Sequence, residues 1–324
     1  MTKNVKTEVK SEAKNQAKKP RKNTWQTIKK DFVRNKVVYL IFLPVLAYYI
    51  IFQYLPIYGL SIAFMDYMPT RGFLGSDWVG FENFRRFFSS IFFGRVVRNT
   101  LMISFYELIF GFPAPIIFAL LLNEIRNKFF KRTIQTVTYL PHFISTMVIS
   151  GMILQFSLSG GLFNDIIALF GGTRSDLLMH SRNFRPIFIG SGIWQSVGWG
   201  SIIYLAALTS IDQELYEAAI IDGASRFKQA IYITIPGIVP TITILLIFRI
   251  GGMMSVGFER VFLLYNPAIY DVSDVIATFV YRRGLINQDF SFATAVGLFN
   301  SAINITLLVI ANTISRKIND NSLW

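Results

Sequence analysis

The sequence predicts an all-α membrane protein that crosses the bilayer six times. Only 16% of its 324 residues are charged and 52% are hydrophobic, whereas a soluble domain ordinarily carries about 25% charged residues. Several apolar runs approach about 20 residues, the length with which an α-helix crosses the hydrocarbon core. Basic and mixed-charge segments alternate between these runs, as they do when successive loops lie on opposite sides of a membrane.

Six spans can be drawn, and the segments between them indicate the orientation. The predicted spans cover residues 37–63, 99–122, 136–157, 187–209, 236–258 and 292–314. Pro44 and Pro56 interrupt the first span, which a membrane helix tolerates where neighbouring groups satisfy the freed carbonyls. The N-terminal segment, the connection at residues 123–135 and the C-terminus are net basic. The positive-inside rule therefore predicts that both termini lie in the cytoplasm.

The N-terminal segment is the most strongly charged part of the chain. Residues 1–36 hold twelve Lys and Arg against three acidic residues, a pattern found in nucleic-acid-binding arms and in cytoplasmic tails. A tail is favoured, and nucleic acid is not expected as a partner, because an apolar span follows at once. Trp25, Ile28 and Phe32 recur at helical spacing among basic residues, which predicts a short helix on the inner membrane surface. Residues 37–324 form the predicted transmembrane domain.

The residue inventory argues against chemistry in this chain. There is no cysteine, and the only histidines are His142 and His180, so a metal site is not expected. No GxxxxGK[ST] phosphate-binding loop occurs, so ATP is not expected to bind here in the P-loop manner. We predict no catalytic residues, no metal and no cofactor bound by this chain.

A polar element between the fourth and fifth spans, residues 210–235, has its own organisation. Ser210 with Gln213, or Asp212, is placed to cap a helix. Within a helix, glycine lowers stability by about 1 kcal/mol relative to alanine, so Gly223 predicts a bend between two short helices. Asp222 or Ser225 would cap the second of these helices. Residues that recur every three to four positions predict one apolar stripe along the element, namely Tyr216, Ile220, Gly223, Phe227 and Ile231. An amphipathic helix resting on lipid would show the same stripe.

The same element carries a specific motif. Glu217, Ala218 and Ala219 are followed by Gly223, six residues after the glutamate, and then by Ile233-Thr234-Ile235-Pro236. This spacing resembles the EAA signature of the inner-membrane permeases of ABC importers, with Ile235 in place of the signature's leucine. The segments TYLPHFIST, GWGSIIYLAAL and the C-terminal SLW are similar to the oligosaccharide and polysaccharide branch of these permeases, which is related to the maltose type. The resemblance covers residues 37–324.

The resemblance implies a fold and a set of partners. It implies a type I importer permease core, also called MetI-like, in a bacterial plasma membrane. The expected partners are a second, similar permease, two ATPase subunits that bind ATP and Mg²⁺, and an extracellular lipid-anchored sugar-binding protein. The residues that the resemblance assigns to ATPase docking are Glu217, Ala218, Ala219, Asp222 and Gly223. Glu217 would meet a basic residue of the ATPase.

Ionisable residues within apolar spans indicate a pathway, because a charge in hydrocarbon is costly. Glu107 in the second span and Arg249 in the fifth lie at matching predicted depths, roughly 12 and 14 Å from the outer surface. They are predicted either to pair or to face one aqueous cavity, unless each has another polar neighbour. Aromatic and amide side chains could bind the ring faces and hydroxyls of a sugar. Those predicted to line the pathway are Trp194, Gln195, Trp199, Asn300 and Asn304. Tryptophans at the interface and asparagines that join helices would give the same pattern.

The first outer loop carries an aromatic segment. Trp78, Phe81, Phe84 and Phe87 have roughly helical spacing, which predicts a surface helix that either receives the binding protein or packs on the outer ends of the spans.

An ion-coupled secondary transporter or channel would need intramembrane acidic groups, for which Glu107 alone is little support. An intramembrane enzyme would need a nucleophile with a base, and His142 has no evident partner.

Overall fold

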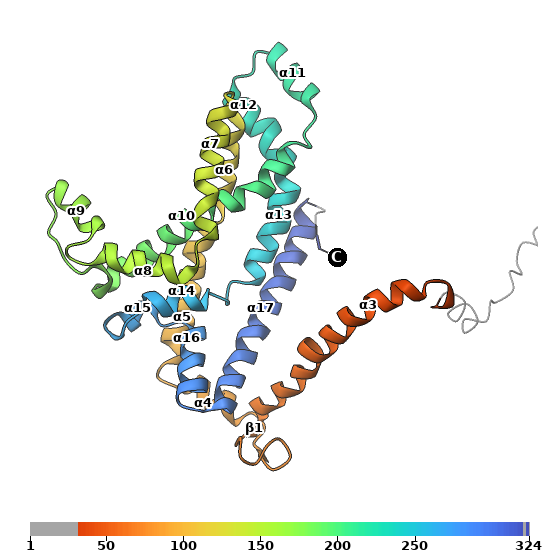
Figure 1. Ribbon diagram of the computed structural model, residues 1–324, viewed down its shortest axis with the longest axis vertical. Coiled ribbons are helices and arrows are strands. Elements are labelled where there is room, and N and C mark those ends of the chain that lie inside the picture. Colours follow the sequence, from red (N-terminus) through yellow and green to blue (C-terminus); the bar gives the residue numbers. More distant parts are fainter. Residues whose placement is uncertain (1–31, 320–321, 324) are drawn as a thin grey trace, which may run out of the picture. The chain divides into compact units, whose positions relative to one another are not determined.

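The computed structural model describes residues 32–319 and 322–323 (Figure 1). The chain divides into two compact units, residues 1–61 and residues 62–324. The predicted tail helix with Trp25 and Ile28 falls outside the described residues. Five helical stretches are long and apolar enough to cross a membrane. They are Lys36–Phe64, Phe93–Glu124, Thr146–Leu169, Arg226–Gly251 and Phe290–Lys317.

The described part of the first unit is one interrupted helix. Helix α3 spans Lys36–Tyr49, a π-helical turn (η1) covers Ile50–Tyr54, and a 3₁₀ helix (η2) begins at Leu55 and runs to Phe64. α3 buries none of its side chains within the chain. An apolar helix with no covered face is typical of contact with lipid or with another membrane subunit. The first predicted span is confirmed as a candidate span.

The second unit is almost entirely helical. Its α-helices are α4 (Glu82–Phe88), α5 (Phe93–Tyr106), α6 (Pro113–Glu124), α7 (Lys128–Tyr139), α8 (Thr146–Ser157), α9 (Leu162–Leu169), α10 (Ser181–Leu208), α11 (Gln213–Ile221), α12 (Arg226–Gln229), α13 (Ile235–Gly251), α14 (Phe258–Leu264), α15 (Tyr270–Ser273), α16 (Ile276–Tyr281) and α17 (Phe290–Asn319). Shorter turns are η3 (Glu107–Gly111), η4 (Leu140–Phe143), η5 (Leu177–Met179), η6 (Ala230–Thr234), η7 (Pro267–Ile269) and η8 (Arg282–Ile286). Strands β1 (Met65–Asp66) and β2 (Asp77–Trp78) pair antiparallel, with Met65 opposite Trp78.

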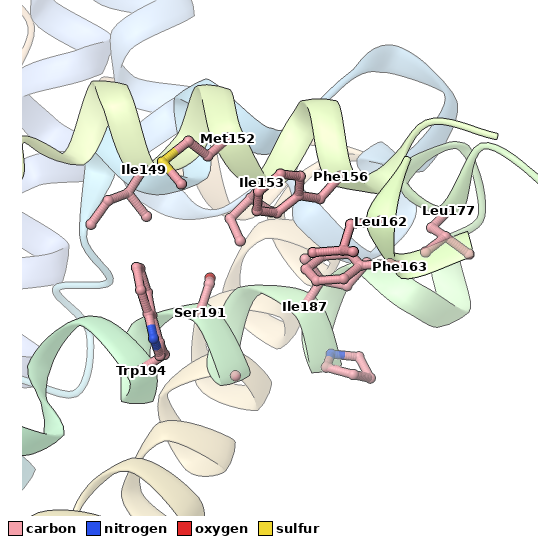
Figure 2. A pocket seen from close by; sticks show the side chains of 12 residues that line it. Ile149, Met152, Ile153, Phe156, Leu162, Phe163, Leu177, Ile187, Ser191 and Trp194 are labelled. Carbon is pink, nitrogen blue, oxygen red and sulfur yellow. The ribbon is translucent and has the colours of Figure 1, made fainter. Parts of the chain in front are cut away.

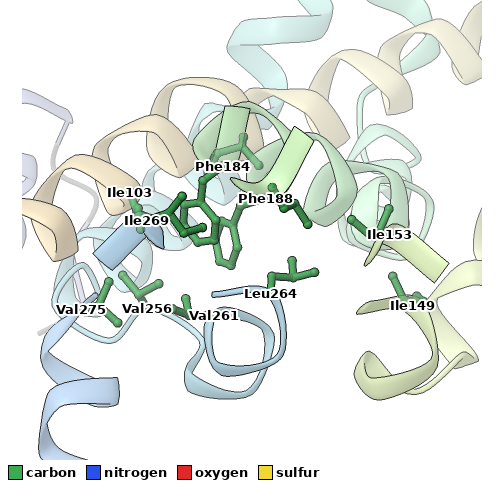
Figure 3. Packing of buried hydrophobic residues seen from close by; sticks show 12 residues of the cluster. Ile103, Ile149, Ile153, Phe184, Phe188, Val256, Val261, Leu264, Ile269 and Val275 are labelled. Atoms are coloured by element: carbon green, nitrogen blue, oxygen red, sulfur yellow. The ribbon is translucent and has the colours of Figure 1, made fainter. Parts of the chain in front are cut away.

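Helix α10 is the central element of this unit. It packs against α6, α7, α13 and α14, and its Phe184 and Phe188 are fully buried with Ile103, Val261 and Leu264 (Figure 3). Inside a bilayer, the apolar faces of helices associate through close van der Waals packing and small residues rather than through the exclusion of water. α10 is 28 residues long, but it is absent from the five candidate spans. The fourth predicted span, residues 187–209, is therefore a helix whose membrane crossing stays a prediction.

Glycines on α10 let two neighbours approach closely. A Cβ at Gly198 would overlap the backbone carbonyl of Thr138 in α7, and one at Gly200 would press against the ring of Pro115 in α6. Small residues at helix crossings are a common packing device in membrane proteins, because they bring the backbones together. The GWGSII segment thus fixes the crossings of α10 with α6 and α7.

The second and third predicted spans are interrupted. In the second, a π-helical turn separates α5 from α6, and the Phe112 amide donates to the Glu107 carbonyl at 2.9 Å. Pro113 follows at once and lacks an N–H, which relaxes the regular ladder. The predicted third span, residues 136–157, is wrong as one helix, because the chain breaks at Pro141 between α7 and α8. The basic connection at residues 123–135 is instead mostly the start of α7.

The fifth span and the loop after it also differ from the prediction. α13 ends at Gly251, seven residues before the predicted end at Phe258, and residues 252–257 leave the helical path. The predicted outer loop 259–291 contains α14, α15 and α16, whose apolar side chains join the core. At the end of α13, Gly251 has no side chain and so admits Leu308 of α17 to close contact.

The outer aromatic segment is only partly the predicted helix. Trp78 belongs to β2, and Phe81 precedes α4, so only Phe84 and Phe87 are helical. Phe87 is fully buried, whereas Trp78, Phe81 and Phe84 surround the ring of Phe64. The prediction of one surface helix through all four residues is therefore wrong. Gly80 explains the interruption, since its φ of 59° ends the strand in a left-handed turn.

Candidate functional site

The EAA element stands at one end of the second unit. In Figure 1, α11 lies at the opposite end from α4 and β1, beyond the ends of α6 and α13. Asp212 is the N-cap of α11, and its carboxylate accepts from the Glu214 amide at 3.0 Å. Ser210 does not form the predicted capping box, because its hydroxyl donates back to the Ala207 carbonyl at 2.7 Å. Of the two predicted N-caps, the structure therefore uses Asp212 and not Ser210.

The predicted bend at Gly223 is confirmed. Gly223 has φ of 73°, a left-handed conformation in which a side chain is strained. Its amide donates to Ile220 at 3.1 Å, and the Ala224 amide donates to Ala219 at 2.8 Å, which closes the end of α11. Ser225 then caps α12 by accepting from the Lys228 amide at 3.4 Å.

Two contacts hold this bend against the membrane helices. Arg226 of α12 forms an ion pair with Glu124 at the end of α6, with Nη1 and Oε2 2.8 Å apart. The Tyr216 hydroxyl lies 3.0 Å from the Thr234 hydroxyl at the base of α13. The element is therefore joined both to the second span and to the fifth, so its movement would be transmitted to both.

The predicted docking residues lie on the accessible side of the element. Glu217, Ala218, Asp222 and Gly223 are exposed, and Ala219 is partly buried. The single apolar stripe predicted along the element is wrong, because the bend separates its members. Tyr216 turns inward to the hydrophobic cluster with Ile233, whereas apolar side chains on the outer side are left uncovered, namely Leu215, Ile220, Ile221, Phe227 and Tyr232.

The charged residues of the second and fifth spans meet in the middle of the unit. Arg249 Nη2 lies 2.5 Å from Glu107 Oε2, so of the predicted alternatives the two residues pair. They line a cavity of about 300 Å³ together with small and apolar groups of α6 and α10. The helix ends from which both depths were counted differ in the structure, because the second candidate span begins at Phe93 and Arg249 lies two residues before the end of α13; the depths themselves stay predictions.

A third charged residue lines the same cavity. Arg260 of α14 reaches it, and its Nη2 donates to Gln195 Oε1 at 2.9 Å. Gln195 in turn donates from Nε2 to the Ile144 carbonyl at 3.3 Å, so it connects the break between α7 and α8 to Arg260. The sequence prediction named Gln195 but missed Arg260, which was assigned to an outer loop.

The other predicted lining residues lie apart from this charged cavity. Trp194 lines a separate apolar cavity of about 550 Å³ between α8, α9 and α10 (Figure 2). Trp199 stacks on His142 with ring centroids 4.6 Å apart. Asn304 accepts from the Met254 amide and donates to Ser255, both at 2.9 Å, and so holds the segment after α13. Asn300 lines a third cavity, of about 480 Å³, beside α16.

A buried carboxylate organises the opposite end of the unit. Asp274 is fully buried and forms ion pairs with Arg95 at 3.1 Å and with Arg282 at 2.6 Å. Its other oxygen accepts from the Thr278 hydroxyl at 2.9 Å. A buried charge is stable where it is paired and hydrogen-bonded, so this group ties α5 to α15 and α16. The sequence reasoning placed Asp274 in a mixed loop and did not find it.

The comparisons with known proteins give the same class as this geometry. Residues 111–320 match the family described as binding-protein-dependent transport system inner membrane component. Protein LplB of Bacillus subtilis (strain 168) is 46% identical over 292 residues, covering 90% of this chain and 92% of LplB. The polygalacturonan/rhamnogalacturonan transport system permease protein YteP of the same organism is 42% identical over 293 residues, covering 90% of this chain and 91% of YteP.

A solved structure agrees over nearly the whole chain. A bacterial alginate ABC transporter, crystallised in complex with an alginate pentasaccharide-bound periplasmic protein, contains a chain that superposes with a TM-score of 0.84. That chain is 41% identical, and the match covers 91% of this chain and 99% of the other. The protein therefore belongs to the binding-protein-dependent inner-membrane components, the permeases of ABC importers. The resemblance drawn from the EAA motif is confirmed, and an ion-coupled transporter is not favoured.

Proposed function

We propose that this chain is the permease subunit of an ATP-driven importer of oligosaccharides in a bacterial plasma membrane. A second permease would complete the pathway, and an extracellular lipid-anchored protein would deliver the sugar. Two ATPase subunits, which carry ATP and Mg²⁺, would dock on the EAA elements of the two permeases. The names of YteP and of the alginate transporter support a saccharide as the cargo.

The observation that carries this proposal is the exposed bend of the EAA element. Glu217 and Ala218 present a charge and a small surface beside the bend at Gly223, and uncovered apolar groups such as Ile221 and Phe227 surround them. An uncovered apolar surface with a polar rim is typical of a protein interaction site. The ion pair between Arg226 and Glu124 would transmit movement of a docked ATPase to the spans.

The orientation of the chain and the membrane crossing of α10 belong to the same proposal. We place α11 and both termini in the cytoplasm, and α4 with the β1–β2 turn outside, because basic segments flank the α11 end. α10, which holds the fourth predicted span, would complete the set of six. Its polar and glycine-rich character suits a helix at the centre of a bundle, where other helices rather than lipid cover it.

Alternating access would follow from these connections. Closure of the ATPases on ATP would move the EAA elements, and the spans would open outward to accept sugar from the binding protein. Reopening after hydrolysis would release the sugar inside. In this scheme the described cavity with Glu107 and Arg249 forms part of the pathway, whereas Trp199 and Asn304 hold neighbouring segments together.

Gly223→Pro tests the docking role. Proline fixes φ near −65° and lacks the N–H, whereas Gly223 has φ of 73° and donates to Ile220. We expect the ATPases to be lost from the purified complex, or their sugar-stimulated turnover to fall at least about tenfold. Gly223→Asn is the control, because asparagine tolerates the left-handed conformation. Normal co-purification and turnover of Gly223→Pro would contradict the docking proposal.

Charge reversal at the Arg226–Glu124 pair tests transmission from the docking element. Both side chains are about half exposed, so the pair contributes at most about 1 kcal/mol to stability. Arg226→Glu is therefore expected to leave folding intact but to lower the sugar molecules transported per ATP by about threefold. The double variant Arg226→Glu with Glu124→Arg should restore the ratio. An unchanged ratio in the single variant would show that the pair does not transmit movement.

A further inference from the structure

Arg260 lines the charged cavity without an ion-pair partner of its own. Arg249 pairs with Glu107, and Arg95 and Arg282 share Asp274. Among the described residues, no carboxylate lies within 4.0 Å of the Arg260 guanidinium. Its hydrogen bond goes to the neutral Gln195, and Glu107, the carboxylate that lines the same cavity, is paired with Arg249.

The surroundings of Arg260 hold the guanidinium in place without neutralising it. Gln195 accepts from Nη2 at 2.9 Å, and the ring of Phe188 lies 5.5 Å from the guanidinium carbon. Nε is buried and makes no hydrogen bond with any described residue. Gly192 leaves the space for the group, because a Cβ at that position would collide with Nη1. The hydrogen bond to Gln195, the ring of Phe188 and the space left by Gly192 together hold the guanidinium at the cavity.

The cavity as a whole has an excess of positive charge. Arg249 and Arg260 line it with one carboxylate, that of Glu107, which leaves a net charge of one positive unit. Ser196 adds a hydroxyl oxygen that can accept from a sugar hydroxyl, since its own proton is donated to the Gly192 carbonyl at 2.7 Å. An uncompensated cation within a membrane protein is costly, and such a residue usually lies in a substrate pathway. An anion that enters the cavity would remove this cost.

We propose that this cavity is an anion subsite of the translocation pathway, in which Arg260 binds the carboxylate of an acidic sugar unit. A guanidinium offers paired donors that match the two oxygens of a carboxylate. Arg249 stands beside it, and Glu107 keeps Arg249 from binding the cargo too tightly. This inference rests on the proposed function, and it narrows the cargo to oligosaccharides that contain uronic acids.

The test compares an acidic and a neutral sugar of the same size. The complex of this chain with its permease and ATPase partners is placed in nanodiscs of phosphatidylcholine, without anionic lipid. The affinities of alginate pentasaccharide and of its carboxyl-reduced, neutral form are then measured by calorimetry. Arg260→Gln is expected to weaken binding of the acidic probe about tenfold, as expected for loss of a hydrogen bond to a charged group, and to leave binding of the neutral probe unchanged. Arg260→Lys should recover part of the loss.

Two matched controls separate charge recognition from damage to the fold. Arg174→Gln removes an exposed arginine that pairs with Asp165, and it should change neither affinity. Gly192→Ala should displace the guanidinium and weaken acidic binding, whereas Gly190→Ala, with no atom within 4 Å of the added Cβ, should not. If the Arg260→Gln complex fails to assemble, the comparison of Gly192→Ala with Gly190→Ala still tests whether the position of the Arg260 guanidinium determines binding of the acidic probe.

The outcomes that overturn the inference are distinct from those that overturn the proposed function. Equal weakening of both probes by Arg260→Gln would make Arg260 a structural residue, and no weakening of either would remove it from the site. A wild-type complex that binds neither probe also overturns the inference. A loss that occurs only after phosphatidylglycerol is added would assign the cavity to a lipid headgroup. In all these cases the coupling measured with Gly223→Pro still tests the proposed function independently.

Discussion

Gly198→Ala is expected to prevent assembly of the permease. A methyl group at this position would overlap the carbonyl carbon and oxygen of Thr138, and backbone atoms cannot turn away as the end of a flexible side chain can. Overpacking of this kind lowers stability by about 3 kcal/mol. We expect the variant to be recovered in much lower yield and to unfold at a lower temperature in detergent, as measured by fluorescence-detected size exclusion after heating.

The control for Gly198→Ala lies on the same helix. Gly190→Ala meets no atom within 4 Å, and alanine is favoured over glycine in a helix by about 1 kcal/mol. This variant should therefore be as stable as the wild type or slightly more stable. Equal stability of the two variants would show that α10 and α7 do not cross as closely as the structure has them.

Local signals in the sequence predicted the EAA element well. Gly223 and Ser225 determine their own conformations, the first through its freedom at positive φ and the second through its capping hydroxyl. The structure places the bend and the second cap at these residues. The first cap was ambiguous because Ser210 and Asp212 both suited it. The prediction of one stripe through Tyr216 and Phe227 failed because these residues lie on opposite sides of the bend.

The charged cavity was only half predictable. Glu107 and Arg249 stand out because each interrupts an apolar run, and opposite signs in neighbouring spans indicate a pair. Arg260 was hidden because residues 259–291 were taken for an outer loop, although α14 carries Val261 and Leu264 at helical spacing and both are buried. That spacing, after the glycines at 251 and 252, was the signal that could have found Arg260.

The bounds of the spans were the least predictable feature. Hydropathy averages over a window, so it does not separate one long helix from two that meet at Pro141. The break matters for the site, because the Ile144 carbonyl just after it is free to accept from Gln195. α10 shows the converse case. It is a continuous helix of 28 residues, yet the glutamine, serines and tryptophans that serve the interior lower its hydropathy.

The ion pair between Glu107 and Arg249 gives the largest expected effect on transport. Arg249→Glu would place two carboxylates beside one cavity in the membrane, and removal of one partner of a poorly hydrated pair costs about 3 kcal/mol. We expect each single variant, Arg249→Glu and Glu107→Arg, to lower ATP-driven uptake of the oligosaccharide about 100-fold. Uptake into proteoliposomes, together with the yield of assembled complex, measures both transport and folding.

The double variant determines whether the pair itself is the cause. Glu107→Arg with Arg249→Glu restores one charge of each sign at two positions whose wild-type side chains are in contact, so uptake should recover to within about tenfold of the wild type. The recovery should be incomplete, because Glu107 begins the π-helical turn before Pro113, where the longer arginine has less room. Arg260, on the same cavity, would then face the exchanged carboxylate from a different direction. Uptake by the double variant no better than by either single variant would show that the two residues act separately.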